Sequence, residues 1–419
     1  MPLLKAENSP GAGMALQIPP NDGLRAKIPA IGMASILVGL MVRPASLNAF
    51  TTEISEPLRA LMLAVGLACA VYMSIVHKIS KITYLSMTLF CFIFAYIHIL
   101  GAENISILPD TSIIWTALAI VLLSILMMSF TGGDGKEFLT AKYIIFLSTT
   151  WSILLYISGG IELGFPLKFI FEIYSVEGYQ FDYTQGVTSL YGTTSICTAI
   201  LIKNGKSKIF SFLYIILLLL FFSLCLAGGS RGEIMFASAM IFFILKPQGK
   251  IYNLIFIIFA FIISISLVQY IIVSDTDIVF LNRLREFVSG SSYGMRDVLY
   301  QQSTSLLKSD IVCLSIGCGA LYFQSYYNLN YDLYPHNILA EYAISAGGLV
   351  TVLVFVSFVY GMIKIPHRSE VFYIGIYSFL IAMKSGDIYG SWIATAFLFF
   401  VATFGLMQAY AGGARSQQV

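Results

Sequence analysis

The sequence predicts an all-α polytopic membrane protein with about twelve transmembrane helices. Of its 419 residues, 58% are hydrophobic and only 11% are charged, and the mean hydropathy is +0.83, whereas a soluble domain carries about 25% charged residues. Apolar runs of about 17–25 residues, the length that crosses a bilayer, recur along the chain. Backbone groups in lipid must be hydrogen-bonded within their own segment, so we expect these runs to be helices.

The predicted spans are spread over almost the whole chain. They lie near 28–43, 58–76, 82–100, 112–130, 141–158, 185–202, 209–227, 233–246, 251–273, 337–363, 370–384 and 388–409. The first, eighth and eleventh are short or polar. Residues 1–24 are rich in Gly, Pro and Asn and lack an apolar signal core, so we expect a disordered cytoplasmic tail followed by a single multi-span membrane domain, 25–419.

The loop charges predict the orientation of these spans. With the N-terminus inside, the inner segments carry 15 Lys and Arg residues and the outer segments carry 9. The short inner segments 77–81 and 203–208 concentrate lysines, and the outer segment 101–111 has acids and no base. Positive charge favours the cytoplasmic side, so both termini are predicted to be cytoplasmic.

Two predicted outer loops are long enough to carry function. One spans 159–184 and is rich in Tyr, Phe and Gly. The other, 274–336, separates the ninth and tenth spans, and we expect an amphipathic helix near the membrane surface at about 293–308. A transporter built from two six-helix halves usually has its long loop after the sixth span, where this chain has only a short polar segment.

The cysteines and histidines predict neither a metal site nor a cofactor. Four cysteines fall inside apolar runs, where they are expected to pack as small hydrophobic residues: Cys69, Cys91, Cys197 and Cys225. Cys313 and Cys318 lie in the second outer loop, and a disulfide between them is the less favoured of two alternatives. The four histidines are far apart and no group has metal-ligand spacing. A net charge of +2 also gives no reason to expect nucleic acid as a partner.

The stretch 228–233, Gly-Gly-Ser-Arg-Gly-Glu, is a candidate anion site on the outer side. Glycines allow backbone amides to approach an anion closely, and the guanidinium of Arg231 can bind phosphate through two hydrogen bonds. A helix that starts near Gly232 would point its positive end at the same place. The alternative is a plain turn with an arginine that reaches the headgroups.

Further arginines lie in the second outer loop. Arg296 occurs in Tyr-Gly-Met-Arg-Asp-Val-Leu-Tyr, and it is either a second phosphate ligand or a surface arginine paired with Asp297. Arg283 and Arg285 are weaker candidates of the same kind. Outer arginines, with a fixed fork of donors, suit phosphate recognition.

The stretch Pro335-His336-Asn337 begins the predicted tenth span and carries the candidate catalytic histidine. An ionisable side chain at this depth is a functional candidate by default, and the alternative is a histidine that only caps the helix. Glu341 lies four residues after Asn337, so both are expected on one helix face, where Glu341 either orients the site or makes a packing hydrogen bond. Asp387 either holds the histidine tautomer, binds a sugar hydroxyl, or is a solvated turn residue.

These residues, in this order, resemble the superfamily of O-antigen ligases and O-antigen polymerases. The resemblance rests on 228–232, Arg296, the Gly-Cys-Gly at 317–319, Pro-His-Asn at 335–337 and the two glycines at 347–348, and is best over about 209–363. It implies a metal-independent membrane glycosyltransferase of the GT-C type. Such enzymes use undecaprenyl-diphosphate-linked glycans at the periplasmic face of the bacterial inner membrane.

The resemblance also implies roles for single residues. Arg231 and Arg296, with Ser230, match the group that holds the diphosphate, and His336 matches the catalytic histidine. Asp387 is a weaker match to a late acidic residue. Met235 stands where the ligase pattern has leucine, and Val350 stands where it has Gly, Thr or Tyr, so a polymerase is favoured over a ligase.

The sequence therefore predicts a polymerase of lipid-linked oligosaccharide repeat units. His336 would act as the general base on the acceptor hydroxyl, and the arginines would hold the diphosphate leaving group. The expected partners are the lipid-linked donor, a glycan acceptor and the bilayer, and a chain-length regulator is left open. The alternatives are a ligase that transfers the glycan to lipid A–core, a transporter or flippase of lipid-linked sugar, and a non-catalytic membrane scaffold.

Overall fold

The computed structural model describes residues 23–42, 49–76, 81–107, 112–127, 138–162, 168–169, 175–176, 179–180, 185–205, 207–246, 295–330, 333–364 and 370–416. These residues are almost entirely helical. Apart from short turns between the helices, they include two antiparallel pairs of two-residue strands, β1 (Ile161–Glu162) with β2 (Lys168–Phe169) and β3 (Ser175–Val176) with β4 (Tyr179–Gln180), all within the first long predicted outer loop.

Helices occur at eleven of the twelve predicted spans. They are α1 (Gly23–Met41), α2 (Ala49–Val76), α3 (Lys81–Leu100), α4 (Ser112–Met127), α5 (Leu139–Ile157), α6 (Gln185–Asn204), α7 (Lys208–Ala227), α8 (Arg231–Leu245), α15 (Gly348–Lys364), α16 (Glu370–Ser385) and α17 (Trp392–Ser416). A 3₁₀ helix, η2 (Ala102–Ile107), follows α3. The ninth predicted span, 251–273, and almost all of the predicted tail, 1–24, lie outside the described residues.

Several of these helices suit a bilayer. Four segments are long and apolar enough to cross a membrane: Pro57–Ile75, Lys81–Leu100, Leu139–Ile157 and Ile209–Ala227. Five shorter apolar helical segments accompany them, in α1, α4, α15, α16 and α17. α7 carries apolar side chains that are largely exposed, such as Ile209 at 80%, as lipid contact requires. The described chain is therefore that of a helical membrane protein.

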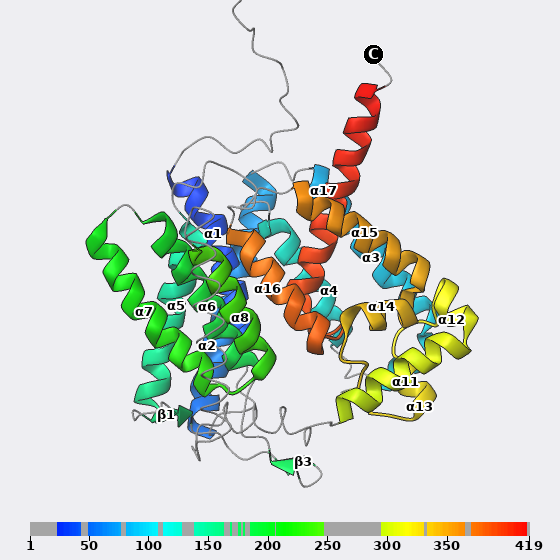
Figure 1. Cartoon of the computed structure of the whole chain (residues 1–419), viewed down its shortest axis with the longest axis horizontal. Coiled ribbons are helices and arrows are strands. Elements are labelled where there is room, and N and C mark those ends of the chain that lie inside the picture. Colours follow the sequence, from blue (N-terminus) through cyan, green and yellow to red (C-terminus); the bar gives the residue numbers. More distant parts are fainter. Residues whose placement is uncertain are drawn as a thin grey trace, which may run out of the picture.

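The helices pack around α17. Its residues Phe397–Ala402 are all nearly or fully buried, and α17 contacts α15, α3, α4 and α16. A second group of neighbours, α6 with α7 and α8, joins this core through α16. In Figure 1 the labelled strands β1 and β3 and the helices α11 and α13 lie toward the lower edge, α12 lies at the right, and the C-terminal end of α17 lies at the upper edge. The described parts of the two long predicted loops thus lie away from the C-terminal end of α17.

The predicted tenth span, 337–363, is wrong as a single helix. The chain forms α14 (Ile338–Ala346), stops at Gly347 and begins again as α15, and Figure 1 shows the two helices running in different directions. At 1.5 Å per residue the nine residues of α14 reach about 14 Å, which is too short to cross a bilayer. Hydropathy did not reveal the break, because the run is apolar on both sides of Gly347.

The second outer loop is more ordered than the sequence predicted. It contains α11 (Met295–Ser309), close to the expected amphipathic helix at 293–308, followed by α12 (Ile311–Ile316) and α13 (Tyr322–Tyr327). Leu299, Leu306 and Phe323 form a small buried cluster with Ile344 of α14. The loop therefore has an apolar core of its own that packs on the helix following His336.

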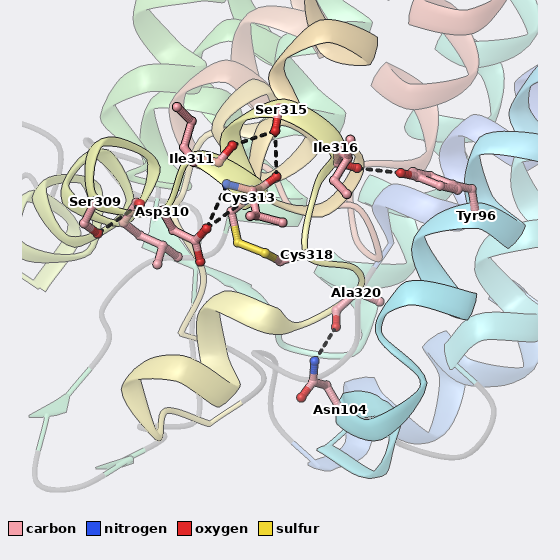
Figure 2. The surroundings of a disulfide bond; sticks show 12 residues. Tyr96, Asn104, Ser309, Asp310, Ile311, Cys313, Ser315, Ile316, Cys318 and Ala320 are labelled. Carbon is pink, nitrogen blue, oxygen red and sulfur yellow. Dashed lines mark hydrogen bonds between the residues drawn. A yellow bond between two sulfur atoms is a disulfide. The ribbon is translucent and has the colours of Figure 1, made fainter.

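A disulfide between Cys313 and Cys318 holds this loop, contrary to the favoured expectation of unpaired thiols. Figure 2 shows it beside the start of α12, where the Asp310 carboxylate accepts hydrogen bonds from the backbone amides of Val312 and Cys313, both at 3.0 Å. The sequence spacing alone could not decide the pairing, because the turn at 317–319 brings the two sulfurs together. Disulfides persist in oxidising compartments, which agrees with an outer location.

The disulfide segment also ties α3 to the turn that follows α12. The Tyr96 hydroxyl donates to the Ile316 carbonyl at 2.6 Å, and the Asn104 amide donates to the Ala320 carbonyl at 3.4 Å (Figure 2). The backbone amides of Cys318 and Gly319 donate to the carbonyls of Ile344 and Ser345. The loop is thus fastened to the outer end of α3 and to the end of α14.

Candidate functional site

The last turn of α16 is the point where the two sequence motifs meet. The helix ends at Ser385, and residues 386–391 form a turn before α17. Lys384 in the last helical turn contacts the start of α8, and the carbonyls of Met383 and Ser385 accept hydrogen bonds from the chain just before α14. Two motifs more than 100 residues apart in the sequence are therefore held by neighbouring residues of one helix end.

The Gly-Gly-Ser-Arg-Gly motif forms the start of α8, as the sequence predicted. Gly229 has φ +76°, a left-handed conformation that suits glycine and turns the chain from α7 into α8. Ser230 is the N-cap residue, and Arg231 is the first helical residue and is half-buried. The guanidinium is therefore carried at the positive end of a 15-residue helix, where anions are favoured.

Ser230 has a different environment from the one expected for a phosphate ligand. It is only 2% exposed, and its hydroxyl donates to the Glu233 carboxylate. Its backbone amide donates to the hydroxyl of Thr188 in α6 at 3.4 Å. In this structure Ser230 supports the start of α8, and a direct contact between its side chain and a ligand stays a prediction.

His336 lies immediately before α14 in an unusual backbone conformation. Its φ is +54°, in the left-handed region that few non-glycine residues adopt. Such a conformation persists only where the surroundings hold it, and it occurs often at functional sites. The ring lies 4.3 Å from the Tyr334 ring between centroids, and the Tyr334 hydroxyl donates to the Ser385 carbonyl at 3.1 Å. The histidine is thus linked to the end of α16 through Tyr334.

Asn337, and not His336, caps α14. Its side-chain oxygen accepts hydrogen bonds from the amides of Leu339 and Ala340, both at 3.0 Å, and its amide donates to the Met383 carbonyl at 2.9 Å. The alternative that His336 serves only as the helix cap is therefore not supported. The asparagine both begins the helix and fixes it to α16.

Glu341 faces the same segment as Asn337, as their spacing predicted. It is 5% exposed, and its carboxylate accepts a hydrogen bond from the Ile388 amide at 3.2 Å. Burial, together with the nearby Asp387 carboxylate, raises the pKa of Glu341 well above that of an ordinary glutamate. Asp387 in turn accepts a hydrogen bond from the Gly390 amide at 2.8 Å, which closes the turn before α17.

The remaining predicted arginines are described only in part. The backbone of Arg296 lies in the first turn of α11, in the outer loop, and its side chain is outside the described residues. Arg283 and Arg285 lie outside them altogether. The contribution of these three side chains to the site stays a prediction.

Two further groups lie next to this site that no sequence motif indicated. The Lys384 ammonium lies 3.0 Å from the Glu233 carboxylate. His98, near the outer end of α3, accepts or donates a hydrogen bond with the Tyr389 hydroxyl at 3.0 Å. Neither contact has a local signal, because the partners are 151 and 291 residues apart.

One group in the described chain has the spacing of metal ligands. The side-chain ligand atoms of Asp310, Cys313 and Cys318 lie within 4.8 Å of one another. The disulfide engages both sulfurs, and Asp310 caps α12. The residues present thus form a structural cross-link and carry no argument for a metal.

Removing the Asn337 side chain is expected to loosen α14. Asn337→Ala removes an N-cap, which lowers stability by about 0.5–2 kcal/mol, and it also removes the hydrogen bond to α16. The thermal unfolding midpoint of the purified protein in detergent measures the loss. Asn337→Ser keeps a capping oxygen and loses only the bond to the Met383 carbonyl, so it should fall between the wild type and alanine. Equal midpoints for all three proteins would contradict this role.

The chain matches no protein-family model and no curated protein.

Proposed function

We propose that the chain is a polymerase of O-antigen or a related polysaccharide. It joins undecaprenyl-diphosphate-linked oligosaccharide repeat units at the periplasmic face of the bacterial inner membrane. In this proposal the chain has twelve spans and a GT-C-like architecture, and both termini are cytoplasmic. The ninth span is the predicted segment 251–273.

The observation that carries the proposal is the meeting of the two motifs at the end of α16. Arg231 lies at the positive end of α8, and Lys384 of α16 contacts that same helix turn. On either side of Lys384 in the sequence, the Met383 carbonyl accepts from Asn337 and the Ser385 carbonyl accepts from Tyr334, whose ring packs on His336. An arginine suited to phosphate and a histidine suited to accept a proton, both linked to one helix end, support a reaction between a diphosphate donor and a hydroxyl acceptor.

In the proposed reaction His336 takes the proton of an acceptor sugar hydroxyl. The oxygen attacks the anomeric carbon of the donor glycan, and the bond from that carbon to the diphosphate oxygen breaks. The electron pair stays on undecaprenyl diphosphate, whose negative charge Arg231 and Arg296 stabilise. Attack opposite the leaving group inverts the anomeric configuration.

The size of the expected effects is consistent with such a site. Each charge-assisted hydrogen bond contributes roughly 1.5–3 kcal/mol, so two arginines that each bind phosphate twice stabilise the leaving group by several kcal/mol. The effect grows where water is excluded. General-base assistance adds about 10²–10⁴ in rate. Asn337 and Glu341 support His336 by fixing α14 to the segment 383–388.

The length of the surface glycan tests this proposal. A strain that lacks the chain is complemented with wild type, His336→Ala, Arg231→Ala or, as a control, Lys364→Ala, and expression is checked in each case. Lys364 ends α15 at the predicted cytoplasmic side. Wild type and the control should restore a ladder of repeat units on a gel. The other two variants should leave the core with at most one repeat unit.

The other outcomes distinguish the alternatives. A deletion strain whose core carries no repeat at all, and which accumulates long lipid-linked chains, identifies a ligase and overturns the polymerase. Lipid-linked repeat units trapped on the cytoplasmic face identify a flippase. A normal ladder with His336→Ala shows that the histidine is structural and that the proposed mechanism is wrong.

A further inference from the structure

The Lys384 side chain lies against the first turn of α8, the turn that begins with Arg231. Its ammonium is 3.0 Å from the Glu233 carboxylate. Glu233 is fully buried, whereas the Lys384 side chain is 26% exposed. The ion pair therefore holds a lysine at the edge of the buried region, with part of the side chain still at the surface.

The Lys384–Glu233 ion pair takes the place of an ordinary capping interaction at the start of α8. Ser230 and Glu233 occupy the first and fourth positions of the Ser-x-x-Glu capping box, in which the glutamate normally accepts a hydrogen bond from the serine amide. Here the Ser230 amide donates to Thr188, and the Glu233 carboxylate accepts from the Ser230 hydroxyl and from Lys384. Glu233 thus binds a side chain of α16 and does not cap the N-terminus of its own helix.

The backbone of α8 leaves room for this lysine. A Cβ atom at Gly232 would overlap the Cδ, Cε and Nζ atoms of Lys384. The Tyr377 hydroxyl, two turns earlier on α16, donates to the Glu233 carbonyl at 3.3 Å and fixes the same contact. The lysine chain therefore crosses the first turn of α8 in close contact with its backbone.

This arrangement concentrates positive charge. A cation is unfavourable at the N-terminus of a helix, where the dipole is already positive, and Arg231 adds a further charge on the same turn. Glu233 offsets part of this charge. A doubly charged anion bound at the turn would offset more of it than a singly charged one.

We propose that Lys384 is a third cation of the diphosphate site and that Glu233 positions it. This inference rests on the proposed function. A lysine ammonium is a donor-only cation, which suits contact with a phosphate oxygen. As the donor bond breaks, negative charge grows on the leaving diphosphate oxygen, and Lys384 stabilises it together with Arg231.

Binding of undecaprenyl diphosphate and undecaprenyl monophosphate to the purified protein in nanodiscs tests the proposal. Lys384→Met should weaken diphosphate binding by at least about tenfold, the effect of one lost charge-assisted hydrogen bond. A monophosphate has one phosphate group, which Arg231 can hold without the lysine, so its binding should change by less than about threefold and the selectivity for diphosphate falls. Lys384→Arg keeps the charge and should restore most of the affinity. Lys364→Met, at the far end of α15, should change neither.

A second variant distinguishes loss of diphosphate binding from loss of the folded structure. Lys384→Met leaves the Glu233 carboxylate buried without its counter-charge, which destabilises a fold. Glu233→Gln combined with Lys384→Met removes both charges and should restore the unfolding midpoint while the loss of selectivity remains. If this folded double variant keeps the selectivity for diphosphate, the role of Lys384 is overturned and the proposed function is not. A wild-type protein that binds neither lipid overturns the proposed function as well.

Discussion

Replacing His336 is expected to slow glycosyl transfer by about 10²–10⁴-fold, the usual effect of losing a general base. The substitution should leave α14 in place, because Asn337 supplies the cap and the bond to α16. The backbone at His336 has φ +54°, which asparagine tolerates better than alanine. His336→Asn is therefore the sharper variant, since it keeps the backbone conformation and removes only the imidazole.

The rate is measured with lipid-linked repeat units extracted from the deletion strain, with products separated by mass. Undecaprenyl diphosphate should bind His336→Asn as tightly as wild type, because in the proposed reaction the histidine acts on the acceptor and not on the leaving group. Arg231→Ala is the matched contrast, because it should weaken that binding. A His336→Asn enzyme with a rate near that of wild type would exclude the histidine as the base.

Placing a larger residue at Gly347 is expected to disrupt the outer side of the fold. Gly347 has φ +90° and ψ 150°, a region that is essentially restricted to glycine. A Cβ atom there would lie 2.6–2.8 Å from backbone atoms of residues 315–317. Backbone strain alone lowers stability by about 1–3 kcal/mol, and the overlap with a second backbone adds to it. Gly347→Ala should therefore separate α14 from the disulfide segment.

The effect is measured as the thermal unfolding midpoint and as the rate of proteolysis between α12 and α14. Gly159→Ala is the matched control, because Gly159 has φ +73° but a Cβ atom there meets nothing within 4 Å. Its stability should fall only by the cost of placing alanine in the left-handed conformation, about 1–2 kcal/mol. Equal losses for the two variants would show that the crossing of the two backbones does not hold the loop.

Hydropathy predicted most of the helices because a bilayer selects on length and polarity along one stretch of chain. α3, α7 and α16 begin and end within about two residues of their predicted limits. α2 begins nine residues earlier than predicted, at Ala49, and continues through Pro57. Prolines are tolerated in transmembrane helices when neighbouring groups satisfy the freed carbonyl.

Two predictions from the sequence were wrong, the single helix over 337–363 and the unpaired cysteines, and both involve contacts between distant segments. The break at Gly347 and the Cys313–Cys318 disulfide both depend on the crossing of two segments about 30 residues apart. Gly317 and Gly347 each have φ near +90° because one backbone passes directly over the other. A glycine in an apolar run carries no sign of the segment that it will meet. Local patterns therefore predicted helix over 337–363 and did not predict the break at Gly347.

The sequence by itself determined the class of protein, the helical segments and the residue types that suit a diphosphate and a hydroxyl. Charge, hydropathy and capping residues act over a few neighbours, so these features can be recognised without a fold. Only the tertiary structure decided that α16 ends between the two motifs, that Lys384 reaches Glu233, and that the Asn337 amide reaches the Met383 carbonyl. Those contacts join residues up to 151 positions apart, and the packing of α16 against α8 and α14 is the physical reason that they form.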